Sequence, residues 1–157
     1  MTALLDDADP EVRCLAAYVL AAASGEIGGV LAALHGRLRV EEVARVRACL
    51  VLAIAQLARE HPDEGAVAWI RACWADPGRP AEVRVSAALA WLCLVDDPIP
   101  DELREVLDAT VTDELARVMA PVPWMHMIAS DDTGLPRCVE HLLAPDAPRV
   151  AARSAEA

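Results

Sequence analysis

Residues 4–20 read LLDDADPEVRCLAAYVL, an acidic turn followed by a mainly apolar segment. Asp9 and Pro10 predict the first turn of a helix, because an aspartate side chain caps free backbone N–H groups and proline is favoured at the first helical position. The pattern recurs in residues 44–54 and again in residues 81–91, so that successive Val-Arg pairs begin 34 and 37 residues apart. The sequence therefore predicts a repeated helical unit.

Helix signals dominate the rest of the chain. No stretch of useful length alternates polar and apolar residues as a half-buried strand would, and Pro, Gly and Asp interrupt helix-sized segments at short intervals. We therefore expect an all-α protein in which short connections make neighbouring helices antiparallel. A weaker fourth copy of the pattern begins at Arg149. The predicted helices cover residues 11–23, 27–37, 41–59, 64–75, 80–95, 101–109, 112–120, 134–143 and 147 to the end.

The pattern Leu-Leu-x-Asp-x-Asp-Pro-x-Val-Arg of residues 4–13, with small and apolar residues up to Leu20, resembles the HEAT repeat, a two-helix unit of α-solenoids. The resemblance implies an α-α superhelix of about four to five antiparallel helical hairpins. These would form one HEAT-like domain over residues 1–157, a fragment of a longer solenoid. Neither end carries a polar capping repeat, and the alternative to a fragment is that the open ends pair with another molecule, for instance by end-to-end self-association.

The resemblance also assigns a role to the recurring arginines. In the family, the aspartate of the turn and the arginine after valine tend to form a ladder that links neighbouring repeats. By that resemblance Asp7 and Arg13 are structural, and so are Arg47 and Arg84 at the same position of the later copies.

Helical spacing separates two stripes on the second helix of each copy. Every position of one stripe is apolar, which predicts the core: Val12, Ala16, Val19, Leu20, Ala23; Val46, Leu50, Ala53, Ile54, Leu57; Val83, Ala87, Ala90, Trp91, Leu94. The stripe one residue earlier is mixed in character, and we name it the second-helix face: Glu11, Leu15, Tyr18, Ala22; Arg45, Cys49, Leu52, Gln56; Glu82, Ser86, Leu89, Cys93. Second helices line the concave, partner-binding surface in solenoids of this kind. The predicted partner-binding residues are Glu11, Tyr18, Arg45, Gln56, Glu82 and Ser86, and the alternative is a solvated helix face with no ligand.

Residues 111–133 break the pattern and predict a degenerate or irregular repeat, because Pro121 and Pro123 cannot both lie within a continuous helix. Three interpretations are open. The apolar cluster that follows (Trp124, Met125 and Ile128) could fill the core. Alternatively, an exposed docking patch would consist of Trp124, Met125 and Met127, since Trp and Met are enriched at interface centres. The third is a soft-metal site from Met125, His126, Met127 and a cysteine, for which the spacing shows no closed ligand set.

Composition limits the partners. The chain has 157 residues, of which 55% are hydrophobic, and a formal net charge of −11. The apolar fraction argues against intrinsic disorder, and the acidic charge argues against a nucleic-acid partner, whose phosphates require cationic side chains. The sequence also predicts no membrane partner and no signal peptide. An odd number of cysteines without CxxC spacing favours a reduced, cytoplasmic protein: Cys14, Cys49, Cys73, Cys93 and Cys138.

No catalytic pattern stands out. The chain lacks His-Glu dipeptides, GxGxxG and, having no lysine, any Walker motif. We therefore expect no catalytic residues, no cofactor and no metal, and a non-catalytic scaffold or regulatory module that binds a protein partner, favouring one with basic residues. The alternative is a HEAT-like enzyme or accessory protein, similar to the bilin lyases or to the alkylpurine DNA glycosylases. The latter resemblance would use tryptophans and an aspartate on the concave face, with four candidates here: Trp69, Trp74, Trp91 and Asp76.

Overall fold

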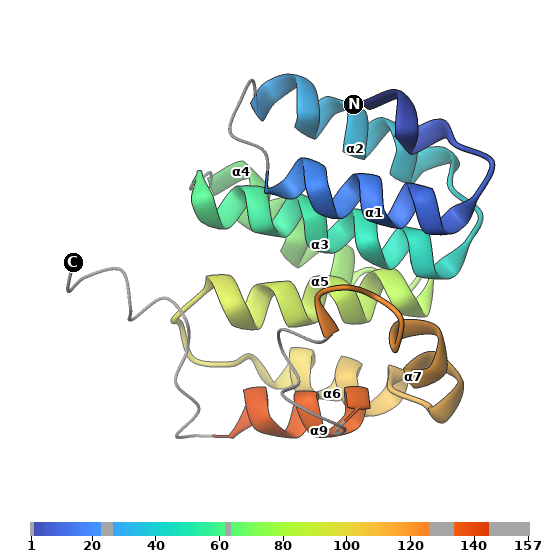
Figure 1. Cartoon of the computed structure of the whole chain (residues 1–157). Helices are drawn as coiled ribbons and strands as arrows, with labels where there is room; N and C mark the ends of the chain where they lie inside the picture. Colours follow the sequence, from blue (N-terminus) through green and yellow to red (C-terminus); the bar gives the residue numbers. More distant parts are fainter. Residues whose placement is uncertain (1, 23–26, 62–63, 126–133, 145–157) are drawn as a thin grey trace.

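The computed structural model describes residues 2–22, 27–61, 64–125 and 134–144, and all regular structure in these ranges is helical (Figure 1). The prediction of an all-α protein is confirmed. The elements are η1 (Thr2–Asp6), α1 (Pro10–Ala21), α2 (Ile27–Val40), α3 (Ala44–Glu60), α4 (Glu64–Ala75), α5 (Ala81–Leu94), α6 (Asp101–Thr110), α7 (Asp113–Met119) and α9 (Gly134–Leu143).

The helix ends follow from local chemistry. Asp9 caps α1, its Oδ1 accepting a hydrogen bond of 2.9 Å from the backbone N–H of Glu11, and Pro10 begins the helix. Thr112 caps α7 in the same way, with the N–H of Leu115 as donor. Helix α7 ends at Met119, just before the two prolines that were predicted to interrupt it.

Helices α1, α3 and α5 lie side by side, and η1, α2, α4 and α6 pack against this row (Figure 1). Helix α3 is central, since it packs against α1, α2, α4, α5 and α7. Its residues from Ala48 to Ala55 are buried on every side of the helix. The sequence of this stretch is apolar throughout, as burial of a helix from several directions requires.

Most of the predicted core stripe is buried, and the exceptions lie near helix ends or at the edge of the row. Val12 and Leu94 are half-buried, and Val19 is exposed, so the placement of Val19 in the core was wrong. Helix α1 has a neighbour in the row on one side, α3, and among the described elements none covers the side on which Val19 lies. Ala23, the helix predicted from residue 147 and the fourth copy of the pattern lie outside the described residues. Among the helices of the described ranges, none is both long and apolar enough to cross a bilayer.

Candidate functional site

The second-helix face is open over α1 and becomes progressively covered toward α5. Glu11, Leu15 and Ala22 are exposed on α1, and Leu15 keeps 56% of its surface accessible. Val19 joins them at 46%, four residues after Leu15 and therefore on the same side of the helix. We call Glu11, Leu15, Val19 and Ala22 the open patch.

Glu11 and Arg45 connect the open patch to α3. The Arg45 guanidinium donates to Glu11 Oε1 at 2.5 Å, across the α1–α3 contact. The side chain of Glu11 keeps 58% of its surface exposed and that of Arg45 24%, so solvent screens the pair and its contribution to stability is small. These two predicted partner-binding residues are accessible and already engage each other.

Two other predicted partner-binding residues do not face solvent. Glu82 is buried and pairs with Arg47, whose Nε lies 2.5 Å from Glu82 Oε1. Ser86 has no exposed surface, and its hydroxyl donates to the Met119 sulfur at 3.8 Å. The prediction that Glu82 and Ser86 lie on an exposed face is therefore wrong. The physical reason is that Arg47 of α3 pairs with Glu82, and that α7 packs against α3 and α5 and covers Ser86 with Met119.

Tyr18 and Gln56 lie under Trp124. The Trp124 indole Nε1–H donates to Gln56 Oε1 at 2.8 Å, and the Tyr18 and Trp124 rings meet edge to face with centroids 5.1 Å apart. Trp124 and Met125 are both buried. The burial of Trp124 and Met125 agrees with the first of the three interpretations of this segment, in which they fill the core. The docking-patch interpretation, in which both are exposed, is wrong for these two residues. Met127, His126 and Ile128 lie outside the described residues.

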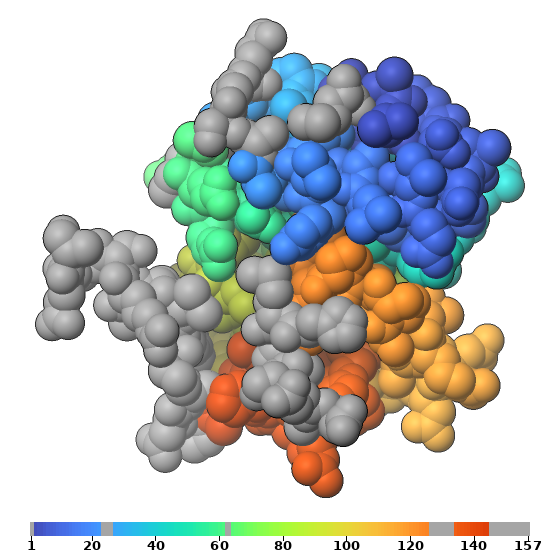
Figure 2. Space-filling view, in the orientation of Figure 1, coloured from blue at the N-terminus to red at the C-terminus, as the bar shows by residue number. Residues whose placement is uncertain are grey.

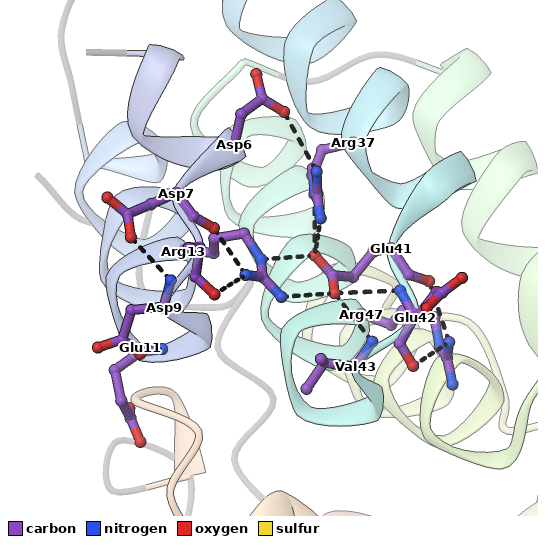
Figure 3. A network of polar contacts seen from close by, with 11 residues as sticks. Asp6, Asp7, Asp9, Glu11, Arg13, Arg37, Glu41, Glu42, Val43 and Arg47 are labelled. Atoms are coloured by element: carbon purple, nitrogen blue, oxygen red, sulfur yellow. Dashed lines mark hydrogen bonds and ion pairs between the residues drawn. The ribbon is translucent and has the colours of Figure 1, made fainter.

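The recurring arginines bind the turns of the fold. Arg13 donates to the backbone carbonyl oxygens of Asp7 and Ala8, and Arg47 donates in the same way to those of Glu41 and Glu42 (Figure 3). Each arginine thus clamps the turn five and six residues before it. The third arginine, Arg84, donates to the carbonyl oxygen of Trp74.

Glu41 is the acidic partner that the sequence analysis missed. Its side chain is buried and accepts hydrogen bonds of 2.9 Å from Arg13, from Arg37 and from the backbone N–H of Val43 (Figure 3). Burial alone would raise the pKa of Glu41, but the hydrogen bonds from Arg13, Val43 and Arg37 outweigh it and lower the pKa to about 2. The ladder expected between Asp7 and Arg13 is therefore made by the backbone of Asp7 and the carboxylate of Glu41.

A sequence signal for Glu41 existed. Asp7 stands six residues before Arg13, and Glu41 stands six residues before Arg47. The two carboxylates also act alike, because each accepts from the N–H two residues on, that of Asp9 or of Val43. Aligning the turns of the copies, as well as their helices, would have selected Glu41.

Burial makes three of the five thiols poor nucleophiles. Burial raises the pKa of the Cys138 thiol to about 12 and also raises those of Cys73 and Cys93, which disfavours their nucleophilic thiolate forms. Within the described ranges no three His, Cys, Asp or Glu side chains are grouped so that they could hold a metal ion. Trp74 and Trp91 pack edge to face in the core, with ring centroids 6.4 Å apart.

Comparison of the chain with protein-family models, with curated proteins and with solved structures finds no match. The chemistry of the face therefore has to be interpreted from its own residues. Those residues give an apolar open patch on α1 with the Glu11–Arg45 ion pair at its edge, the side chains of Tyr18 and Gln56 under Trp124, and a closed end at Ser86.

Proposed function

We propose that the chain is a HEAT-like solenoid domain that binds a protein partner, without catalysis, through the second-helix face. Two observations support this architecture: α1, α3 and α5 lie side by side, and Arg13 and Arg47 clamp the turns before α1 and α3, while Arg84 at the same position of the third copy donates to the last turn of α4. The observation that carries the binding proposal is the exposed pair Leu15 and Val19, two large apolar side chains on one face of a helix. Exposed apolar groups that cluster in this way mark interaction sites.

The chemistry of the open patch defines the partner. Leu15 and Val19 are spaced four residues apart, which suits the apolar side of an amphipathic helix laid along α1. Glu11 lies on the rim of the same patch, and the chain carries a net charge of −11. A partner helix with leucine-like residues on one side and arginine or lysine beside them would therefore complement both the shape and the charge.

Support for a non-catalytic role comes from the tryptophans that a glycosylase-like enzyme would use to recognise a base. Trp74 and Trp91 are buried against each other, and Trp69 is half-buried against His35 on α2, with ring centroids 4.6 Å apart. Aromatic side chains that recognise a base have to be accessible to stack on it. The burial of these tryptophans therefore favours a role in packing the helices over a role in recognising a base.

The test is affinity capture from an extract of the source cells with three forms of the chain. The first is the wild type, and the second is Leu15→Glu/Val19→Glu, which adds charge to the open patch. The third is Ala68→Glu/Ala72→Glu, a matched control that adds the same charge, at the same spacing, to exposed positions of α4. Circular dichroism confirms that all three forms retain their helices.

The proposal expects a protein that the wild type and the α4 control capture and that the open-patch variant does not. That protein is then purified, and its Kd for the open-patch variant is expected to be weaker by a factor of about 10 to 100, since burial of one Leu or Val side chain contributes about 1.5–3 kcal/mol. Equal affinity of all three forms would contradict binding at this face.

A further inference from the structure

The segment Ala120–Met125, which we call the strap, covers the second-helix face after α7 ends. In the space-filling view its orange surface lies directly against the blue surface of the α1 region (Figure 2). Its backbone hydrogen bonds stay local: Ala120 donates to Ala116, Val122 to Met119 and Met125 to Val122, each at 2.9 Å. Pro121 and Pro123 have no N–H to donate. Among the described residues, side-chain contacts therefore hold the strap on α1 and α3.

Trp124 is the anchor of the strap. It bridges two helices, meeting the Tyr18 ring on α1 and donating its indole N–H to Gln56 on α3. Gln56 is half-buried, and its amide N–H₂ donates to the exposed Glu60 one turn later at 3.4 Å, so that its oxygen is left to accept from the indole. Tryptophan side chains held in well-packed, desolvated pockets are typical of the residues that contribute most to protein–protein binding.

The open patch adjoins this anchor site. Tyr18 is the neighbour of Val19 in the chain and lies three residues, about one helical turn, after Leu15. A helix that docks on Leu15 and Val19 therefore arrives beside Trp124. The open patch and the anchor site form one continuous surface, of which the chain itself covers one part.

We propose that the strap is an intramolecular ligand of the second-helix face, and that a partner completes its binding by replacing Trp124 with a tryptophan of its own. This inference rests on the proposed function and adds the partner's anchor residue and the regulation of the site. A ligand tethered in cis acts at an effective concentration in the millimolar range, so the strap lowers the apparent affinity of every competing segment.

The test uses a fluorescein-labelled peptide with the sequence of residues 117–125, RVMAPVPWM, and the 157-residue chain. Fluorescence anisotropy measures binding to the wild type and to Trp124→Ala, in which the anchor site is vacated. We expect Trp124→Ala to bind the peptide at least about tenfold more tightly than the wild type, because the competing cis ligand is weakened. A peptide with alanine in place of tryptophan is expected to lose this binding.

Two control variants separate recognition from loosening of the fold. Trp69→Ala removes a tryptophan from α4, outside the row of α1, α3 and α5, and is expected to gain no affinity for the peptide. The double variant Gln56→Leu/Trp124→Ala keeps the site vacant but removes the acceptor of the indole N–H, and it should bind the peptide about fivefold more weakly than Trp124→Ala. A folded Trp124→Ala protein that ignores the peptide would overturn the proposal.

Hydrogen exchange of the wild type decides the question if Trp124→Ala does not fold. The indole N–H signals of Trp74, Trp91 and Trp124 report three positions in one NMR experiment. A strap that detaches locally lets the Trp124 indole exchange faster than the two core indoles, at a rate that low urea concentrations leave unchanged. Exchange of Trp124 at the core rate, with the core's urea dependence, would make the strap a permanent part of the core and overturn the proposal.

The outcomes also separate this inference from the function on which it rests. Leu15 and Val19 lie outside the strap, so a partner captured through them but not competed by the peptide would leave the proposed function intact and refute the strap as its competitor. If capture of the partner is unaffected by the open-patch substitutions and by the strap peptide, both the proposed function and the strap inference are refuted.

Discussion

Arg13 on α1 and Glu41, directly after α2, form a two-point ion pair in which both side chains are buried. Arg13 Nε lies 2.9 Å from Glu41 Oε2, and a second guanidinium nitrogen lies 2.9 Å from Oε1. The same carboxylate accepts from Arg37 and from the N–H of Val43, at the start of α3. One side chain thus joins α1 and α2 to the beginning of α3, and the partners that surround it compensate for the burial of its charge.

Replacement of Glu41 by Gln is expected to lower the free energy of unfolding by about 3 kcal/mol. Glutamine preserves the shape but leaves the buried Arg13 guanidinium without a counter-charge, and removal of one partner of a buried pair typically costs about 3–5 kcal/mol. Urea unfolding followed by circular dichroism measures the change. Asp6→Asn is the matched control, because Asp6 pairs with Arg37 at 3.3 Å but is exposed, and its loss should cost about 0.5 kcal/mol or less. Equal effects of the two substitutions would contradict this role for Glu41.

The stability that Glu41 supplies should disappear in acid. Its pKa in the folded protein is lowered from 4.5 to about 2, so the contribution is fully present above about pH 4.5 and is lost as the pH falls toward 2. The difference between these two pKa values corresponds to about 3 kcal/mol. Urea unfolding of the wild type and of Glu41→Gln between pH 6 and pH 2.5 isolates it, because every other carboxylate is common to both proteins. The difference in the free energy of unfolding between the wild type and Glu41→Gln is expected to become smaller below pH 4.5. A difference that stays constant with pH would mean that the substitution acts through packing and not through the charge of Glu41.

Local features of the sequence predicted the helices well, because helix starts, helix ends and the apolar period are short-range properties. Asp9 with Pro10 began α1, and the prolines after Met119 ended α7, as expected. The recurrence of Val-Arg in each copy also predicted that Arg13, Arg47 and Arg84 occupy equivalent positions. Glu41 was accessible to the same argument, since it holds the place of Asp7 in the second copy, but its pairing with Arg13 depends on how α1 and α3 pack.

The exposure of the second-helix face could not be predicted in the same way. Ser86 and Gln56 are polar residues on a helix stripe, and periodicity alone assigns such residues to solvent. The side chains that cover them come from far along the chain, Met119 being 33 residues from Ser86 and Trp124 being 68 residues from Gln56. Only the long-range packing of α7 and the strap determines which part of the face stays open.

Ser86 provides a direct check on the closed end of the face. Ser86→Ala is expected to change the free energy of unfolding by about 1 kcal/mol or less, since it removes a hydroxyl whose acceptor is a thioether sulfur, a weak partner. Ser86→Glu should destabilise the protein by more than about 3 kcal/mol, because it places an unpaired charge beside Met119 in the interior. Ala81→Glu is the control on the same helix, exposed and in the first turn, where a carboxylate is neutral or favourable. If Ser86→Glu were tolerated as well as Ala81→Glu, the face would be open at Ser86.

The hydrogen bond between Trp124 and Gln56 should appear as an energetic coupling. Trp124→Phe keeps an aromatic ring against Tyr18 but removes the indole N–H, and Gln56→Leu removes the acceptor while preserving the volume of the side chain. Each single variant leaves one polar group of this part-buried pair without its partner, whereas the double variant leaves neither, so the double variant is expected to be more stable than the sum of the two single effects. The expected coupling is about 1 kcal/mol, measured by urea unfolding of the wild type and the three variants as a double-mutant cycle. Strictly additive effects would mean that the strap is held by its apolar contacts alone, and that the face would not distinguish a tryptophan anchor from a phenylalanine.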